Sequence, residues 1–297
     1  MIYKLRHETR YDYVRDVDVA THYVHLGLRT MPWQRVISSH ITATPNPSRI
    51  AAGVDCFGND AAWIFMDTPH PRFAVVLDAV VEVTGQACPA AEQTPAWESV
   101  AQAAAIGGPD TVLCAEFLYA SPMISPFDAM RDYAAMSFPP GRPVMAGLVD
   151  LTLRIRREFA FSATASEIGT PLTTILAQKA GVCQDFSHLM IAGLRSLGLP
   201  ARYASGYIRT RPPPGGKKLR GADQSHAWVS CWLGAAHGWL DVDPTNGVIV
   251  ADEHVVLAYG RDFADVSPVL GVILGGGAHR VRVSVDLEPA DVPARTS

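Results

Sequence analysis

The stretch Gly181–Tyr207, GVCQDFSHLMIAGLRSLGLPARYASGY, decides the fold of this chain because it combines a helix, a strand and one cysteine. Apolar residues recur in it three and four positions apart, at Phe186, Leu189, Met190, Gly193, Leu194 and Leu197. This spacing predicts a helix with one buried stripe that begins close to Cys183. The following residues, ARYASGYIRT, are typical of a strand. The sequence therefore predicts that Cys183 lies at a helix N-terminus.

Cys183 taken alone has two interpretations. A single cysteine in an amphipathic helix is most often a small core residue. A helix N-terminus also stabilises a thiolate, because unpaired backbone N–H groups and the helix dipole point at it. The same N–H groups are suited to receive an oxyanion. A nucleophilic role would further require a base and a residue that orients the base.

Two later segments offer such residues. SHAWVSCW (225–232) and WLDVDPTN (239–246) both alternate like strands, joined as a hairpin across GAAHG. His226 lies on one face of the first strand, and Asp241 and Asp243 share one face of the second. These faces meet if paired positions have an odd sum, such as Trp232 opposite Trp239, whereas a symmetric five-residue loop would separate them. The pattern leaves both aspartates open as partners of His226.

The rest of the chain predicts an α+β protein. The opening IYKLRHETRYDYV alternates as a half-buried strand, and further β-branched runs follow between turn residues. We expect an antiparallel β-sandwich-like domain over residues 1–85, a connector over 86–145 and a catalytic core over 146–265. The C-terminal segment, 266–297, contains an alternating run, HRVRVSVDLEP, that is suited to pair with the N-terminal domain.

Composition and charge exclude several classes of function. With 297 residues, 48% of them hydrophobic and 18% charged, the chain has the profile of a globular protein with a substantial core. A net charge of -4 gives no general basis for binding nucleic acid or an anionic membrane. The basic loop RPPPGGKKLRG (211–221) suits either an acidic substrate or simple solvation, and solvation is the commoner role of such a loop.

The cysteines and histidines predict neither disulfides nor a metal site. Five cysteines are scattered without a CxxC pair, so we expect reduced thiols and a cytoplasmic protein, with no signal peptide and no membrane span. A metal site would have to gather Cys183, His188, His226 and His237, which lack the close spacing of zinc ligands. We expect no metal and no organic cofactor. The sequence leaves the oligomeric state open.

The three segments GVCQDFSHLMIAGLRSLGLPARYASGY, GADQSHAWVSCWL and GWLDVDPTN resemble, in this order and spacing, the transglutaminase-like superfamily. The resemblance is to a bacterial branch of candidate cysteine proteases. HETRYDY and DCFGNDAAWIFMDTPHPRFAVV resemble the β-rich N-terminal region of that branch, and YGRDFADVSPVLGVILGGG resembles its C-terminal segment. The resemblance covers almost the whole chain and implies a papain-like, transglutaminase-core fold.

The resemblance implies a role for each candidate residue. Cys183 would be the nucleophile, His226 the general base and acid, and Asp243 the residue that orients His226. Asp241 would then be structural or lie just behind the site. Four further residues, without a direct chemical role, are expected to cap the helix, support the site or line the substrate groove: Gln184, Asp185, Ser225 and Trp228.

Three hypotheses about function follow. The first is a cysteine hydrolase that cleaves peptide, isopeptide or amide bonds of a peptide or protein through a thioester. The second is a protein-glutamine transglutaminase, in which an amine replaces water as the acceptor. The third is a non-catalytic binding module that retains the fold. We favour the hydrolase, because water is the most abundant acceptor in the cytoplasm.

Overall fold

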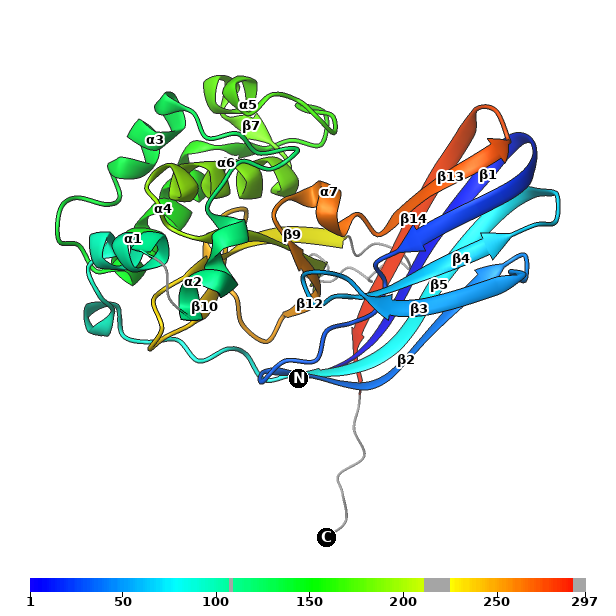
Figure 1. Cartoon of the computed structure of the whole chain (residues 1–297), viewed down its shortest axis with the longest axis horizontal. Coiled ribbons are helices and arrows are strands. Elements are labelled where there is room, and N and C mark those ends of the chain that lie inside the picture. The colour runs from blue at the N-terminus through cyan, green and yellow to red at the C-terminus, as the bar shows by residue number, and fades with distance from the viewer. Residues whose placement is uncertain (107–108, 211–224, 291–297) are drawn as a thin grey trace, which may run out of the picture.

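The computed structural model describes residues 1–106, 109–210 and 225–290, which form a β-rich unit beside a unit of helices and sheet (Figure 1). The predicted α+β class is confirmed, and the large sheet of each unit is antiparallel. The strands of the β-rich unit are β1 (Ile2–Val24), β2 (Gln34–Thr44), β3 (Arg49–Val54), β4 (Asp60–Met66), β5 (His70–Val83), β13 (Val269–Gly275) and β14 (His279–Pro289).

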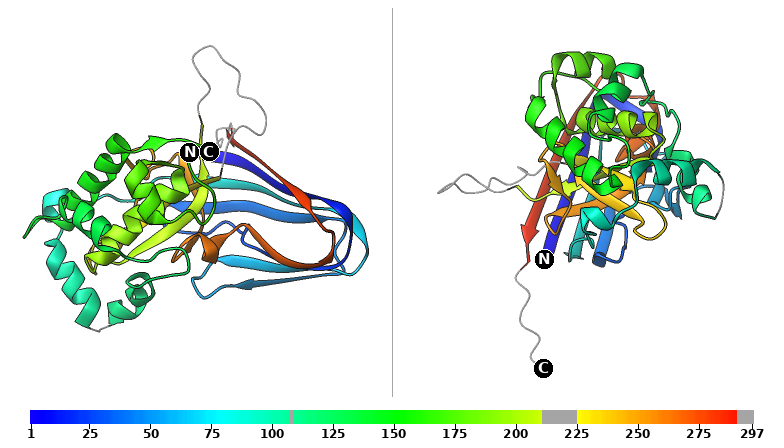
Figure 2. Two further views of the ribbon diagram at one scale, coloured as in Figure 1. Left: turned by 90° about the horizontal axis from the view of Figure 1, so that it is seen from above. Right: turned by 90° about the vertical axis from the view of Figure 1, so that its left-hand side faces the viewer.

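Strand β1 organises the β-rich unit because it runs through both halves of the seven-stranded sheet. Its first half pairs with β5 and β14, and its second half pairs with β4 and β13. The register is irregular between Asp12 and Val17, and the sheet bends so that its halves face each other (Figure 2). His22 and Phe73 stack between the two halves with ring centroids 3.8 Å apart. The unit is therefore sandwich-like, although one bent sheet builds it.

Both ends of the chain contribute to the β-rich unit. Strands β13 and β14 lie beside β1 over most of its length (Figure 1). The C-terminal segment therefore supplies two strands where the sequence pattern indicated one. The first half of β1 alternates as a half-buried strand, with Tyr3, Leu5, His7 and Thr9 buried.

The second unit has a five-stranded sheet in the order β11-β10-β9-β8-β12. Its strands are β8 (Ala201–Ile208), β9 (Ser225–Trp232), β10 (Trp239–Asp243), β11 (Val248–Ile249) and β12 (His254–Gly260), and β6 (Ala160–Phe161) and β7 (Ala180–Gly181) form a separate parallel pair. The helices are α1 (Trp97–Ile106), α2 (Pro109–Cys114), α3 (Asp128–Ala135), α4 (Val144–Glu158), α5 (Leu172–Gln178), α6 (Cys183–Ser196) and α7 (Phe263–Val266), with 3-10 turns at Ala91–Gln93 and Ala115–Phe117.

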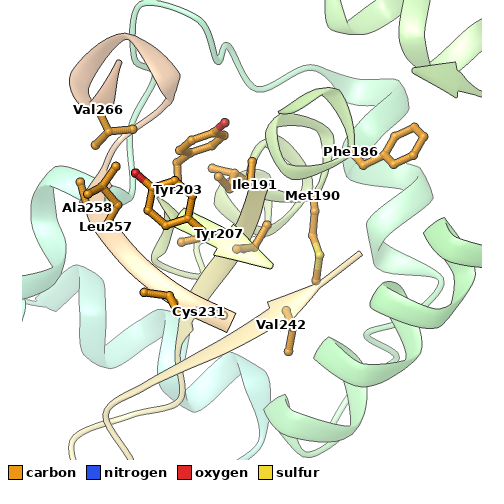
Figure 3. Close-up of a cluster of buried hydrophobic side chains, with 14 of the residues drawn as sticks. Phe186, Met190, Ile191, Tyr203, Tyr207, Cys231, Val242, Leu257, Ala258 and Val266 are labelled. Carbon is orange, nitrogen blue, oxygen red and sulfur yellow. The ribbon is translucent and has the colours of Figure 1, made fainter. Parts of the chain in front are cut away.

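Helix α6 begins at Cys183 as predicted, but it is buried on all sides instead of along one stripe. One side packs on β8 and β9, and α3, α4 and α5 cover the other. Figure 3 shows Met190 and Ile191 of this helix among core residues that include Cys231 and Val242. Polar residues on the outer side find partners inside the protein, since the Arg195 guanidinium donates to backbone carbonyls of four residues, Phe117, Tyr119, Ala201 and Arg261. The helix is therefore a rigid platform for Cys183.

The segment expected to be a connector, residues 86–145, contributes to the second unit. Helix α3 packs directly on α6, with Met130 and Ala134 against Gly193. A Cβ atom at Gly193 would come within 2.9 Å of both side chains, so only glycine permits this close helix contact. Part of the predicted connector, helix α3, thus supports the helix that carries Cys183.

Side-chain amides dock the two units onto each other. Strand β12 is an edge strand of the second sheet, and such edges carry unpaired backbone groups. The Gln34 amide donates to the Val256 carbonyl at 2.7 Å and accepts from the Val256 N–H at 2.7 Å. The Asn59 amide bonds both backbone groups of Tyr259 in the same way, at 2.7 and 2.9 Å. These contacts complete the hydrogen bonding of the edge and fix the β-rich unit beside it.

We predict that Gln34→Met destabilises the protein by about 2 to 4 kcal/mol, because it leaves the N–H and C=O of Val256 buried without partners. Urea unfolding measures the change. Gln102→Met on the exposed face of α1 replaces the same side chain without such a loss, and is expected to stay within about 0.5 kcal/mol of the original. Equal effects of the two substitutions would show that the amide contacts do not hold the units together.

Candidate active site

The start of α6 is built around the Asp185 carboxylate. This carboxylate accepts the backbone N–H of Val182 at 2.8 Å and the hydroxyl of Ser166. Gly181 leaves the necessary space, since a Cβ atom there would lie 2.7 Å from a carboxylate oxygen of Asp185. An acidic group in the first turn also favours the positive end of the helix dipole. Asp185 therefore caps the helix that presents Cys183.

The β9–β10 hairpin has the register that the catalytic hypothesis requires. Trp232 pairs with Trp239, and the Leu233 N–H donates to the Gly238 carbonyl at 2.9 Å, so the loop has an even number of residues. His226 and Asp243 consequently lie diagonally across the two strands. Nε2 of His226 is 2.8 Å from Oδ2 of Asp243. The hairpin thus joins the histidine and one of the two candidate aspartates.

The Asp243 carboxylate is completely buried and accepts five hydrogen bonds. Its Oδ1 accepts the backbone N–H groups of Thr245 and Asn246 at 2.9 and 3.1 Å. Its Oδ2 accepts from the His226 ring, from the Asn246 amide at 2.6 Å and from Nε2 of His254 at 3.1 Å. Burial would raise the Asp243 pKa, but hydrogen bonds from His226 and His254 hold that pKa well below its ordinary value. Asp243 is therefore ionised throughout the neutral range.

The His226 ring joins this carboxylate to the Cys183 thiol. Burial would lower the His226 pKa, but hydrogen bonds to Asp243 and Cys183 raise it to about 10. Since Nε2 of the ring faces Asp243, Nδ1 is left for the sulfur. The structure brings together all three residues to which the resemblance assigned catalysis. A protonated imidazole hydrogen-bonded to the buried Asp243 carboxylate is the favoured state of this arrangement.

Asp241 has a different environment, as the resemblance implied. Its Oδ2 accepts the Trp228 indole N–H at 2.9 Å and the Tyr259 hydroxyl at 2.7 Å. The Arg202 guanidinium lies over the Tyr259 ring at 3.7 Å and supplies a compensating positive charge. Asp241 therefore anchors Trp228 in the core and does not contact His226 through any hydrogen bond of the described residues.

The remaining predicted residues lie around the cysteine and histidine. Gln184 and Ser225 line a cavity beside Cys183, and Ser225 is exposed at the start of β9. Trp228 is fully buried and packs near His226 with ring centroids 6.0 Å apart. Cys231 is fully buried on β9 and belongs to the core. The basic loop at 211–221 lies outside the described residues.

Two cavities meet at the cysteine and histidine. One, of about 360 Å³, extends toward the β-rich unit. The other, of about 420 Å³, extends along Arg156, Phe159 and Phe161. Both cavities are lined by Cys183, Ser225 and His226. A bound chain therefore has room on both sides of the thiol.

One group of side chains has the composition of a metal site. His226, Asp243 and His254 offer three ligand atoms within 4.8 Å of one another. The two histidine nitrogens lie 2.8 and 3.1 Å from the same oxygen of Asp243, which are hydrogen-bond lengths. A metal ion would need the rings of His226 and His254 to give up these bonds to Asp243. The geometry fits a hydrogen-bonded chain better than a metal centre.

Sequence reasoning missed two partners of Asp243. Asn246 stands in the motif VDPTN, three residues after Asp243, and an Asx-type turn at Asp-Pro was a local signal for it. His254 had no local signal, because it reaches Asp243 from β12, across the sheet. Only knowledge of the strand order would have placed it at the site.

The fold and this cluster define a transglutaminase-like protein, and comparison with known proteins agrees. Residues 140–244 match the model of the transglutaminase-like superfamily, and residues 3–82 match the bacterial transglutaminase-like N-terminal region. The chain belongs to the transglutaminase-like superfamily. Among the described residues, no helix is long and apolar enough to cross a membrane.

Relatives and solved structures extend the likeness to the whole chain. An uncharacterised protein of Mycobacterium tuberculosis is 35% identical over 294 residues, covering 97% of this chain and 92% of the relative. One of Mycobacterium leprae is 29% identical, covering 95% and 96%. The crystal structure of a candidate cysteine protease from Cytophaga hutchinsonii matches with a TM-score of 0.74, at 20% identity, covering 99% and 92%. At that identity the match shows the fold alone.

We predict that Asp243→Asn lowers the pH at which His226 loses its proton by about 1 to 2 units from about 10, because one charge-assisted hydrogen bond is lost. NMR titration of the histidine rings, with His226 assigned from His226→Gln, measures the change. Asp241→Asn is the matched control, and should leave the titration in place even if it lowers stability. If only Asp241→Asn shifted the titration of His226, Asp241 and not Asp243 would be the residue that orients His226.

His254→Ala is expected to move the same titration upward by up to about 1 unit. Without His254, the Asp243 carboxylate loses one donor on Oδ2, and its charge acts more strongly on His226. The opposite signs for the two variants separate a positioning effect from general destabilisation. A downward shift with His254→Ala would mean that Asp243 leaves its place without this hydrogen bond.

Proposed function

We propose that the protein is a cysteine-nucleophile acyl-transfer enzyme acting on amide bonds of peptides or proteins. The carrying observation is the hydrogen-bonded chain from Cys183 through His226 to Asp243. The thiolate attacks the amide carbonyl carbon, and His226 donates its proton to the departing amine as the C–N bond breaks. The product of this half-reaction is a thioester on Cys183. Asp243 keeps the ring oriented and charged until the proton leaves.

The start of α6 is the proposed site of oxyanion stabilisation. The first backbone hydrogen bond of the helix runs from the Phe186 N–H to the Val182 carbonyl. The N–H of Cys183 precedes that bond and has no acceptor within the helix. It lies at the positive end of the helix dipole, where it would stabilise the charge that develops on the substrate oxygen.

We favour water as the acceptor that resolves the thioester. His226, neutral after the first half-reaction, would remove a proton from water, and the hydroxide would displace the thiolate. A transferase is the alternative, favoured by one local likeness. A protein-glutamine gamma-glutamyltransferase of Pseudomonas aeruginosa is 38% identical over 71 residues, which is 24% of this chain and 10% of that protein. The mechanism requires no cofactor, and a cytoplasmic location also remains part of the proposal.

A Cys183→Ala variant tests the proposal directly. We predict a fall in amide cleavage of at least about 1000-fold, because the nucleophile is lost. Fluorescent casein and a panel of peptide aminomethylcoumarin amides are the substrates. Cys88→Ala, at an exposed cysteine outside the site, is the control and should retain full activity. Cleavage that survives in Cys183→Ala would point to another nucleophile.

The same assay separates the two acceptors when a glutamine peptide and dansylcadaverine are added. Ammonia release without incorporation of the amine supports the hydrolase. Incorporation that outpaces hydrolysis establishes the transferase. If Cys183 is alkylated no faster than buried Cys231 and no substrate is turned over, the result favours a non-catalytic binding module.

A further inference from the structure

The cavity of about 360 Å³ beside Cys183 is built partly by the β-rich unit. His7, Thr9 and Tyr11 of β1 and Val281 and Val283 of β14 form its far wall. The near wall comes from the start of α6 and from β8 and β9 of the catalytic unit. Neither unit encloses this space alone. The β-rich unit thus contributes directly to the surroundings of the nucleophile.

Apolar side chains remain exposed around this cavity. Ile168, Val281 and Val283 line it and are 73%, 45% and 55% exposed. Tyr203 and Phe263 lie deeper on its wall. Folding leaves these groups in water, and an apolar ligand would cover them. The position next to the reactive thiol identifies that ligand as part of a substrate.

The lining of the cavity carries no formal charge apart from the Cys183–His226 pair. Among the described residues that line it there is no aspartate, glutamate, lysine or arginine. His7 is also neutral near pH 7, since burial lowers its pKa to about 4, and its ring nitrogens bond Tyr207 at 2.7 Å and Thr9 at 3.0 Å. The second cavity differs because Arg156 lines it. The two sides of the thiol therefore present different chemistry.

We propose that the cavity between β1, β14 and α6 is a specificity subsite for an uncharged, bulky apolar side chain adjacent to the scissile amide. The substrates would be peptides with an aromatic or branched aliphatic residue at that position. This inference rests on the proposed function. The volume falls within the range of small-molecule pockets, about 300 to 1000 Å³, and so admits one large side chain with its backbone. A carboxylate there would lose hydration without gaining a partner.

Peptidyl chloromethyl ketones test the subsite without knowledge of the natural substrate. In these probes the thiolate forms a carbon–sulfur bond at the methylene carbon, and chloride leaves. The rates at which acetyl-Phe and acetyl-Asp chloromethyl ketones alkylate the full chain are compared. Each rate is divided by the rate of the same probe with glutathione. Iodoacetamide, which has no side chain, reports the intrinsic reactivity of Cys183. Mass spectrometry identifies the alkylated cysteine.

We expect Cys183 to react at least about 10-fold faster with the Phe probe than with the Asp probe, which is the discrimination that an apolar pocket usually provides. Val283→Lys should reduce this preference at least about fivefold, with each rate normalised to iodoacetamide, because an ammonium in the lining gives the Asp probe a partner and disfavours an apolar side chain. Val272→Lys is the matched control, because Val272 is 79% exposed on neighbouring β13 and does not line the cavity. Val283→Ile should retain the preference.

The outcomes separate the two proposals. If Cys183 reacts rapidly with iodoacetamide but equally with both ketones, or if Val272→Lys matches Val283→Lys, the subsite is wrong and the enzyme proposal stands. If Cys183 reacts with iodoacetamide no faster than buried Cys231, the proposed function fails, and the subsite fails with it.

Discussion

The buried carboxylate of Asp243 is the constraint on which the site depends. An ion without solvent is stable only when donors surround it, and this one accepts five hydrogen bonds from four residues, Thr245, Asn246, His226 and His254. The turn after β10 provides two backbone N–H groups and one amide, whereas β9 and β12 each provide one histidine. Meeting this requirement fixes the hairpin register and the position of β12, and it leaves His226 aimed at the start of α6.

The β-rich unit is held to the same framework by the edge of the second sheet. Gln34 and Asn59 complete the backbone hydrogen bonds of β12, the strand that also carries His254. Gln86 likewise bonds both backbone groups of Asp241 on β10, at 2.9 and 3.1 Å. The wall that β1 and β14 present to the thiol is therefore set by paired polar contacts with little freedom to slide. A rigid wall is what a selective pocket requires.

Local patterns predicted the parts of this protein whose structure is decided locally. The alternation of β1 and the start of α6 at Cys183 follow from periodicity of two and 3.6 residues. The Trp232–Trp239 register did not follow from periodicity, because it was a requirement of the catalytic hypothesis. Periodicity did not predict the burial of polar residues such as Arg195, which form hydrogen bonds inside the protein. A periodic pattern records the polarity of a residue but not its hydrogen-bond partners. It also could not place His254, because strand order is set by contacts between distant segments.

The charges of the site also determine the pH range in which the site stabilises the fold. The Asp243 pKa is lowered in the folded state, so its contribution is present above its ordinary value of 3.8 and is lost as the pH falls. The His226 pKa is raised, so its contribution is complete below the ordinary value of 6.5 and is lost as the pH rises toward about 10. Both contributions are complete only in the mildly acidic interval between these ordinary values. At neutral pH the stabilisation from His226 is already partly lost. The His226 ring is nevertheless still charged in the folded state, because its pKa there is about 10. At neutral pH His226 therefore keeps the proton that it would donate to the departing amine.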